Sequence, residues 1–338
     1  MVVRLAVWPR HVKGNSTSSR EGKERERERP TVMQSILLSR REVDALYDCV
    51  QGVAEALDSL GARWCLVAGS LLGAVRSGSL LFCDDDVDLA VLEKDYLSVR
   101  SELGTLLHSR GVGSLVTRPW PGSDHVRPAR CTHMWLDLFV LRRFESREDL
   151  AALLRVKANG QPQPAGYCEA ILARIDGAAP RFPLWHYDSR KAIELWPREF
   201  FADHELLPLR RDLPFGPLAA PCVPARPVGH LLRAYGADVF TTYRIADSHV
   251  DWVKELRERV AASGLVPGSK GRLEDLHFLP VQHSLRARRV DASDASRYGR
   301  AKVEAFVARE LELHAEHCGR HCEGAALELK TEEQHGHP

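Results

Sequence analysis

The sequence predicts a domain of the α/β (α+β) class. Three observations support this: apolar patterns with helical and with strand periodicity alternate between residues 40 and 145, the apolar runs that would form strands are short, and turn residues separate them. Such alternation is typical of helices packed on a sheet, because each element must bury its apolar face against another. The chain has 338 residues, enough for one large core or two smaller ones.

The first predicted helix spans residues 40–60. Ser39 and Glu42 have the spacing of a capping box, in which each side chain accepts a hydrogen bond from the other residue's backbone N–H. Apolar residues then recur at helical spacing, and Gly61 lies where a helix commonly ends. We therefore expect an amphipathic helix that covers the sheet.

A buried strand is predicted over residues 64–68, because an apolar run precedes a turn at Gly69 and Ser70. The alternation then continues through a short helix at 71–76, a strand at 87–92, a helix at 93–110 and a strand at 133–141.

The second half of the chain is less regular, since proline is frequent between residues 160 and 230. Helices are predicted at 227–235, 249–260 and 298–313. The resulting division has four parts: a disordered charged leader at 1–38, a main domain at 39–262, a linker at 263–296, and a helix with a polar tail at 297–338.

Charge and hydropathy exclude several classes of protein. Lys and Arg number 47 against 46 Asp and Glu, so bulk charge would not hold a nucleic acid. No stretch reaches the roughly 18 uncharged apolar residues of a membrane helix, and the first residues do not resemble a secretory signal. We expect a cytoplasmic protein, and a Golgi lumen location only if a targeting segment is missing from this chain.

The most informative segment is 69–89. Asp84, Asp86 and Asp88 are two residues apart, so in an extended segment they would point to one side and Asp85 would point away. Crowded carboxylates raise one another's pKa unless a cation lies between them. Mg²⁺ and Mn²⁺ prefer such hard oxygen ligands. The pattern predicts a Mg²⁺ (or Mn²⁺) site that serves a nucleotide; the alternative is a solvated acidic turn.

Other residues favour the metal site. Gly69 and Ser70 stand at a strand-to-helix junction, where backbone N–H groups and the helix dipole attract phosphate. Asp137 lies between two leucines, and a carboxylate there is costly unless it is paired or binds metal; an edge-strand surface position is the alternative. Arg76 could reach a phosphate or pair with an acidic neighbour. Gly73 lies inside the short predicted helix, where glycine is about 1 kcal/mol less favourable than alanine. This cost indicates that another part of the backbone or a ligand comes too close for a side chain.

These motifs resemble the LicD / fukutin-related protein family. The resemblance rests on Gly-Ser-Leu-Leu-Gly-Ala-Val-Arg at 69–76 and Asp-Asp-Asp-Val-Asp-Leu at 84–89, and on His-Met-Trp-Leu-Asp-Leu-Phe at 133–139. Looser likeness extends over 196–201, 213–216 and 231–236, so about 40–250 is covered. The family usually has Trp where this chain has Cys83.

The resemblance implies a polymerase-β-like nucleotidyltransferase fold, with a mixed sheet flanked by helices and a helical C-terminal extension. It also implies a metal-dependent phosphotransferase. Such an enzyme moves phosphocholine, or a polyol phosphate such as ribitol phosphate, from a CDP-linked donor to a glycan hydroxyl and releases CMP. Two alternatives stay open: a nucleotidyltransferase that releases pyrophosphate, and a non-catalytic scaffold on the same fold.

Site residues follow from the same resemblance. Four carboxylates would bind metal: Asp84, Asp86, Asp88 and Asp137. Of these, Asp137 would complete the metal site or take the proton of the acceptor. Gly69 and Ser70 would hold the phosphate through backbone donors, and Arg76 would neutralise its charge.

Two further groups of residues could have a function, but each also has a purely structural explanation. Histidines and cysteines between 314 and 322 could bind Zn²⁺, or form a polar helix end. The aromatic residues Trp185, Tyr187 and Trp196 could line a sugar or base pocket, or belong to the core.

Overall fold

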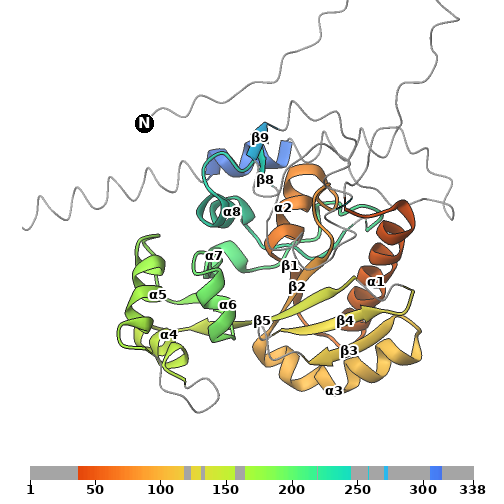
Figure 1. The fold of residues 1–338 in the computed structure, drawn as a ribbon, viewed down its shortest axis with the longest axis horizontal. Coiled ribbons are helices and arrows are strands. Elements are labelled where there is room, and N and C mark those ends of the chain that lie inside the picture. The colour runs from red at the N-terminus through yellow and green to blue at the C-terminus, as the bar shows by residue number, and fades with distance from the viewer. Residues whose placement is uncertain are drawn as a thin grey trace, which may run out of the picture.

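The computed structural model describes residues 37–117, 123–130, 134–156, 164–218, 220–244, 258, 270–272 and 305–313. Its centre is a mixed sheet with the strand order β1-β2-β5-β4-β3, to which β6 and β7 are joined beside β5 (Figure 1). The strands are β1 (Trp64–Leu66), β2 (Val87–Leu92), β3 (Gly113–Thr117), β4 (Asp124–Pro128), β5 (Leu136–Phe144), β6 (Leu184–Tyr187) and β7 (Phe201–Ala202).

Only one pair in this sheet is parallel, that of β2 with β5. All six residues of β2 are buried, as expected of a strand covered on both faces. The helices of the first half are α1 (Arg40–Ser59), α2 (Ala68–Ser77) and α3 (Glu93–Ser109). Of these, α1 and α3 pack against each other and against the central strands, while α2 packs on β2 (Figure 1).

The predicted α/β class and the first predicted elements are confirmed. The capping box of α1 is present in both directions, between Ser39 and Glu42. One boundary differs, because α2 begins at Ala68, and Gly69 and Ser70 lie within its first turn. The buried hydroxyl of Ser70 accepts a hydrogen bond from the backbone N–H of Asp88, which fixes that first turn on β2.

The second half of the chain forms a small second core and also contributes to the main core. Its helices are α4 (Arg147–Leu154), α5 (Tyr167–Asp176), α6 (Arg190–Leu195), α7 (Asp203–Leu206) and α8 (Pro227–Tyr235). Buried side chains of α4, α5, β6 and α6 pack into one cluster around Phe144 at the end of β5. Apart from α8, the sequence did not predict these helices, which are short; α5, α6 and α7 also lie in the part of the chain where proline is frequent.

The predicted ends of the domain need correction. Leu37 and Leu38 fall in the predicted leader but are buried in the main core, so the ordered chain begins before residue 39. Residues 270–272 fall in the predicted linker, yet they form β9 (Lys270–Arg272), which pairs with β8 (Thr242–Arg244).

The C-terminal extension is helical over residues 305–313 and attached to the main core. Phe306 is buried there, and the guanidinium of Arg210 lies 4.8 Å from its ring centroid and 3.2 Å from Glu310. The predicted helix at 249–260, apart from residue 258, and the His/Cys-rich tail lie outside the described residues. Among the helices that are described, none has both the length and the apolar character needed to cross a membrane.

Two histidines are fully buried where the small core meets α8. The His230 ring stacks on Phe201 with centroids 3.8 Å apart, and its Nδ1–H donates to the Phe200 carbonyl. His186 accepts a hydrogen bond at Nδ1 from the N–H of Tyr187. Burial lowers the pKa of His186 to about 3 and that of His230 to about 4, and the positive charge of Arg233 contributes to both shifts.

These histidines predict a loss of stability in acid. The unfolded chain takes up protons below pH 6.5 while the folded chain does not, so the free energy of unfolding falls as pH drops from about 6.5 toward 4. Each histidine contributes up to about 1.4 kcal/mol per pH unit. Urea unfolding between pH 4 and 8 should show this slope.

The variant His230→Asn keeps a donor at the Nδ1 position and should reduce the slope, whereas His108→Asn, at an exposed site on α3, should not. An unchanged slope in His230→Asn would show that this group does not couple folding to pH.

Candidate metal centre

Carboxylates from two neighbouring strands meet near the start of both strands. Because β2 and β5 run parallel, Asp88 lies directly beside Asp137 in their register. The segment before β2 contributes Asp86, and carboxylate oxygens of Asp86, Asp88 and Asp137 all lie within 4.8 Å of one another. The pairing of β2 with β5 and the segment before β2 together gather three of the four carboxylates that the sequence singled out.

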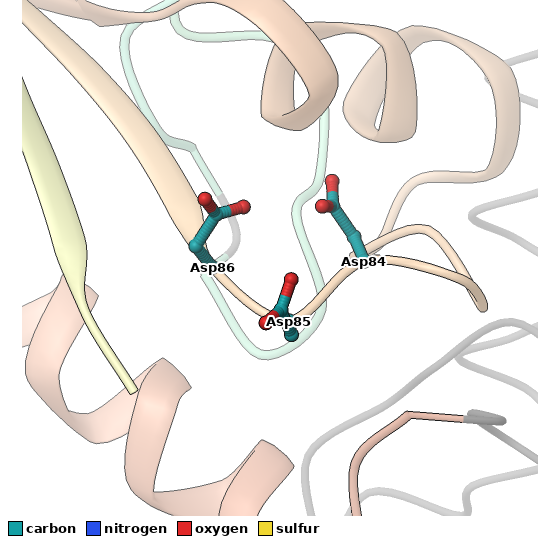
Figure 2. A group of neighbouring side chains, drawn as sticks. All are labelled: Asp84, Asp85 and Asp86. Carbon is teal, nitrogen blue, oxygen red and sulfur yellow. The ribbon is translucent and has the colours of Figure 1, made fainter. Parts of the chain in front are cut away.

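A second acidic group overlaps the first. Carboxylate oxygens of Asp84, Asp85 and Asp86 also lie within 4.8 Å of one another, so Asp86 belongs to both groups. Figure 2 shows these three side chains on the connection that leads into β2. The prediction that Asp85 points away is wrong, because residues 84–86 bend before the strand begins and side chains do not alternate there.

The two acidic groups surround Asp86 with negative charge. Partial burial raises the pKa of Asp86 well above its usual range, and the charges of Asp88, Asp84, Asp85 and Asp137 raise it further. A divalent cation would reverse this effect, since it favours the ionised carboxylates. The donors are all carboxylate oxygens, the set that Mg²⁺ and Mn²⁺ prefer. The acidic residues therefore fit a divalent metal ion.

The first turn of α2 lies against the acidic connection. A Cβ atom on Gly69 would come 2.6 Å from Oδ2 of Asp84 and 3.8 Å from Oδ2 of Asp88. Only glycine leaves room for the Asp84 carboxylate beside the helix, and Figure 2 shows that side chain directed toward the neighbouring helix. Phosphate binding by the backbone N–H groups of Gly69 and Ser70 stays a prediction.

Arg76 lies at the opposite end of α2. Its Nη1 donates to the carbonyls of Val239 at 3.2 Å and Thr242 at 3.0 Å, so it joins α2 to the segment after α8. Burial lowers the pKa of Arg76, while the negative charge of Asp84 opposes that shift. Arg76 thus holds the backbone of the segment after α8, and phosphate binding by Arg76 stays a prediction.

Gly73, in the same helix, confirms the expected close approach. A Cβ atom there would lie 2.4 Å from the carbonyl oxygen of Ser79, so the approaching group is another part of the backbone.

A buried glutamate with two tyrosines lies near the acidic residues. Glu199 accepts hydrogen bonds from Tyr187 at 2.7 Å and Tyr235 at 3.0 Å. Burial raises the pKa of Tyr187, and the charges of Glu199 and Asp88 raise it further, so this group lies within electrostatic reach of Asp88. Tyr187 is a core residue, whereas Tyr235 is 38% exposed. The sequence did not single out Glu199, because its partners come from distant segments.

His125 on β4 was also missed. It lies opposite Asp137 in the antiparallel pairing of β4 with β5, and its Nδ1 is 2.7 Å from Oδ1 of Asp137. The only sequence signal is a histidine in a short strand of weak alternation, and the strand itself was not predicted.

Comparison with known proteins identifies this region. Residues 61–140 match the family model described as LicD/FKTN/FKRP, nucleotidyltransferase domain. This part of the chain belongs to the LicD family. The LicD match extends from the end of α1 into β5 and includes all five aspartates of the two acidic groups.

Similar solved structures are more distant. They are of terminal uridylyl transferase 4 from Trypanosoma brucei with bound GTP, UTP or CTP, at 13–14% identity. They cover 81% of this chain and 92% of the other, with TM-scores of 0.22, 0.22 and 0.21, too low to support a functional argument. No curated protein matches the chain.

Gly69→Ala tests the contact between α2 and the acidic connection. The added methyl group displaces the Asp84 carboxylate, so we expect weaker Mn²⁺ binding, by about tenfold if Asp84 supports the ion. Gly104→Ala is a matched control, because its Cβ would meet only ordinary contacts with Leu115. Titration of Mn²⁺ by electron paramagnetic resonance measures both affinities, and equal values for the two variants would contradict the prediction.

Asp86→Asn tests the electrostatic cost of the site. The raised pKa means that ionised Asp86 destabilises the metal-free fold at pH 7, so the amide should raise its melting temperature. A gain of about 1 kcal/mol corresponds to about 2–4 °C in a domain of this size. The same variant should lose the stabilisation that added Mg²⁺ gives the wild type. Calorimetry with EDTA and with Mg²⁺ measures both effects, and a less stable metal-free variant would argue against crowding.

Proposed function

We propose that the protein is a metal-dependent phosphotransferase. It moves a phospho-alcohol group, such as phosphocholine or ribitol phosphate, from a CDP-linked donor to a hydroxyl group of a glycan, and CMP leaves. The observation that supports this is the convergence of Asp86, Asp88 and Asp137 within 4.8 Å in a segment of the LicD family. A cluster of this kind has little structural use without a cation, because it opposes folding.

Each carboxylate has a role in this proposal. Asp86 and Asp88 hold the metal ion, and Asp84 with Asp85 supports them or holds a second ion. When bound, Mg²⁺ or Mn²⁺ supplies positive charge to the phosphoryl oxygens. The first turn of α2 offers backbone N–H groups to the donor phosphate, on the side where Gly69 leaves space.

The reaction is an in-line displacement at phosphorus. The acceptor oxygen forms a bond to the phosphorus of the transferred group, and the bond from that phosphorus to the oxygen of CMP breaks. Asp137 completes the metal site and also takes the proton of the acceptor hydroxyl; its side chain is 15% exposed and so can meet an acceptor. Most of the rate enhancement would come from positioning and charge neutralisation, as in other phosphoryl transfers.

The direct test is release of CMP from CDP-choline, CDP-ribitol and CDP-glycerol, each with Mg²⁺ and with EDTA. We expect metal-dependent CMP from one donor, at a rate that Asp88→Asn lowers at least about 100-fold, because an amide is a poor ligand for Mg²⁺. Asp48→Asn, at a surface carboxylate of α1, should keep the wild-type rate.

Other results would redirect the proposal. Pyrophosphate release from a nucleoside triphosphate, without CMP from any CDP-linked donor, would identify a nucleotidyltransferase. Nucleotide binding that persists in Asp88→Asn, with no turnover of any donor by the wild type, would support a non-catalytic scaffold.

A further inference from the structure

We propose that His125 is a positioning residue that fixes the Asp137 carboxylate for metal binding, and that Ser123 orients His125. This inference rests on the metal site proposed above. It concerns a strand that contributes none of the five aspartates. His125 on β4 and Asp137 on β5 are directly opposite each other in the pairing of these two strands.

The contact between His125 and Asp137 is close and sheltered. Nδ1 lies 2.7 Å from Oδ1, and the two side chains are 6% and 15% exposed. The ring is not aligned for a linear hydrogen bond in this arrangement. At this distance an unprotonated Nδ1 would place its lone pair against those of the carboxylate. With the hydrogen on Nδ1, the contact is attractive.

Ser123 completes a chain of three polar groups. Its Oγ lies 3.2 Å from Nε2 of His125, and both residues are buried. With the hydrogen on Nδ1, the Nε2 atom of a neutral ring accepts, so the serine hydroxyl donates to it. The His125 ring also packs against Trp135 in a T-shaped arrangement, with centroids 5.8 Å apart. The ring thus has a neighbour at each nitrogen and a third at Trp135, which together hold it in place.

The opposite face of β4 is anchored separately. Asp124 accepts from Arg100 at 2.6 Å and from the Tyr96 hydroxyl, and both partners belong to α3. Because side chains alternate along a strand, His125 points away from α3, toward the face that bears Asp137. The strand is therefore held from one side by α3, and it presents His125 on the other.

Asp137 needs such a support because of its acidic neighbours. It faces Asp86 and Asp88 across a few ångströms, so without a cation repulsion would turn its carboxylate away. The His125 contact engages Oδ1 and leaves Oδ2 available to the ion. Partners of ligating carboxylates usually matter, and their loss typically costs 10–100-fold in metal affinity.

Two substitutions at one position separate this role from simple packing. In His125→Asn the amide nitrogen takes the place of Nδ1 and can still contact Asp137. In His125→Gln the amide reaches the place of Nε2 and can contact Ser123, but the group beside Asp137 is lost. Both replace a ring by a smaller amide, so a general packing defect would affect them similarly.

The measurement is Mn²⁺ affinity of the full chain, by loss of the free-ion signal in electron paramagnetic resonance, with melting temperature as a check on folding. We expect His125→Gln to bind Mn²⁺ at least about tenfold more weakly, and His125→Asn to stay within about threefold of the wild type. Equal affinities of the two variants and the wild type would overturn the positioning role. A wild type that binds no Mn²⁺ would overturn the metal site itself, and this inference with it.

Discussion

The parallel pairing of β2 with β5 is the interaction on which the rest of the site depends. It sets Asp88 beside Asp137, and every other acidic residue is placed relative to that pair. The pairing is secure because apolar side chains of both strands are buried in one core with α1 and α3. A shift of one residue in either strand would turn its carboxylate to the opposite face, so the register of the core also fixes the register of the site.

The site costs stability in the absence of a cation. Asp86 is partly buried and surrounded by four like charges, and its raised pKa reflects first the burial and then the repulsion. The surrounding structure resists it: Ser70 binds the backbone of Asp88, Gly69 leaves room for Asp84, and His125 contacts Asp137. Such residues keep the carboxylates together rather than splayed, which is what a site preorganised for metal requires.

The sequence predicted the parts of the fold whose signals are local. The apolar run of β2 and the capping box of α1 identify themselves within a few residues, and aspartates in an apolar strand are conspicuous. His125 and Glu199 could not be found this way, because their partners lie on other strands and on α8, which only the tertiary fold brings near. The helices α4 and α5 were missed since their small core is made largely of one another.

Metal binding by carboxylates from β2 and β5 is the central claim, and anomalous scattering tests it most directly. Crystals grown with Mn²⁺ should show an anomalous difference peak in contact with Asp86, Asp88 and Asp137, with the Oδ1 contact of His125 retained. A Mn²⁺ ion bound elsewhere, or these three carboxylates turned apart with no peak between them, would contradict a metal-dependent transferase at this site.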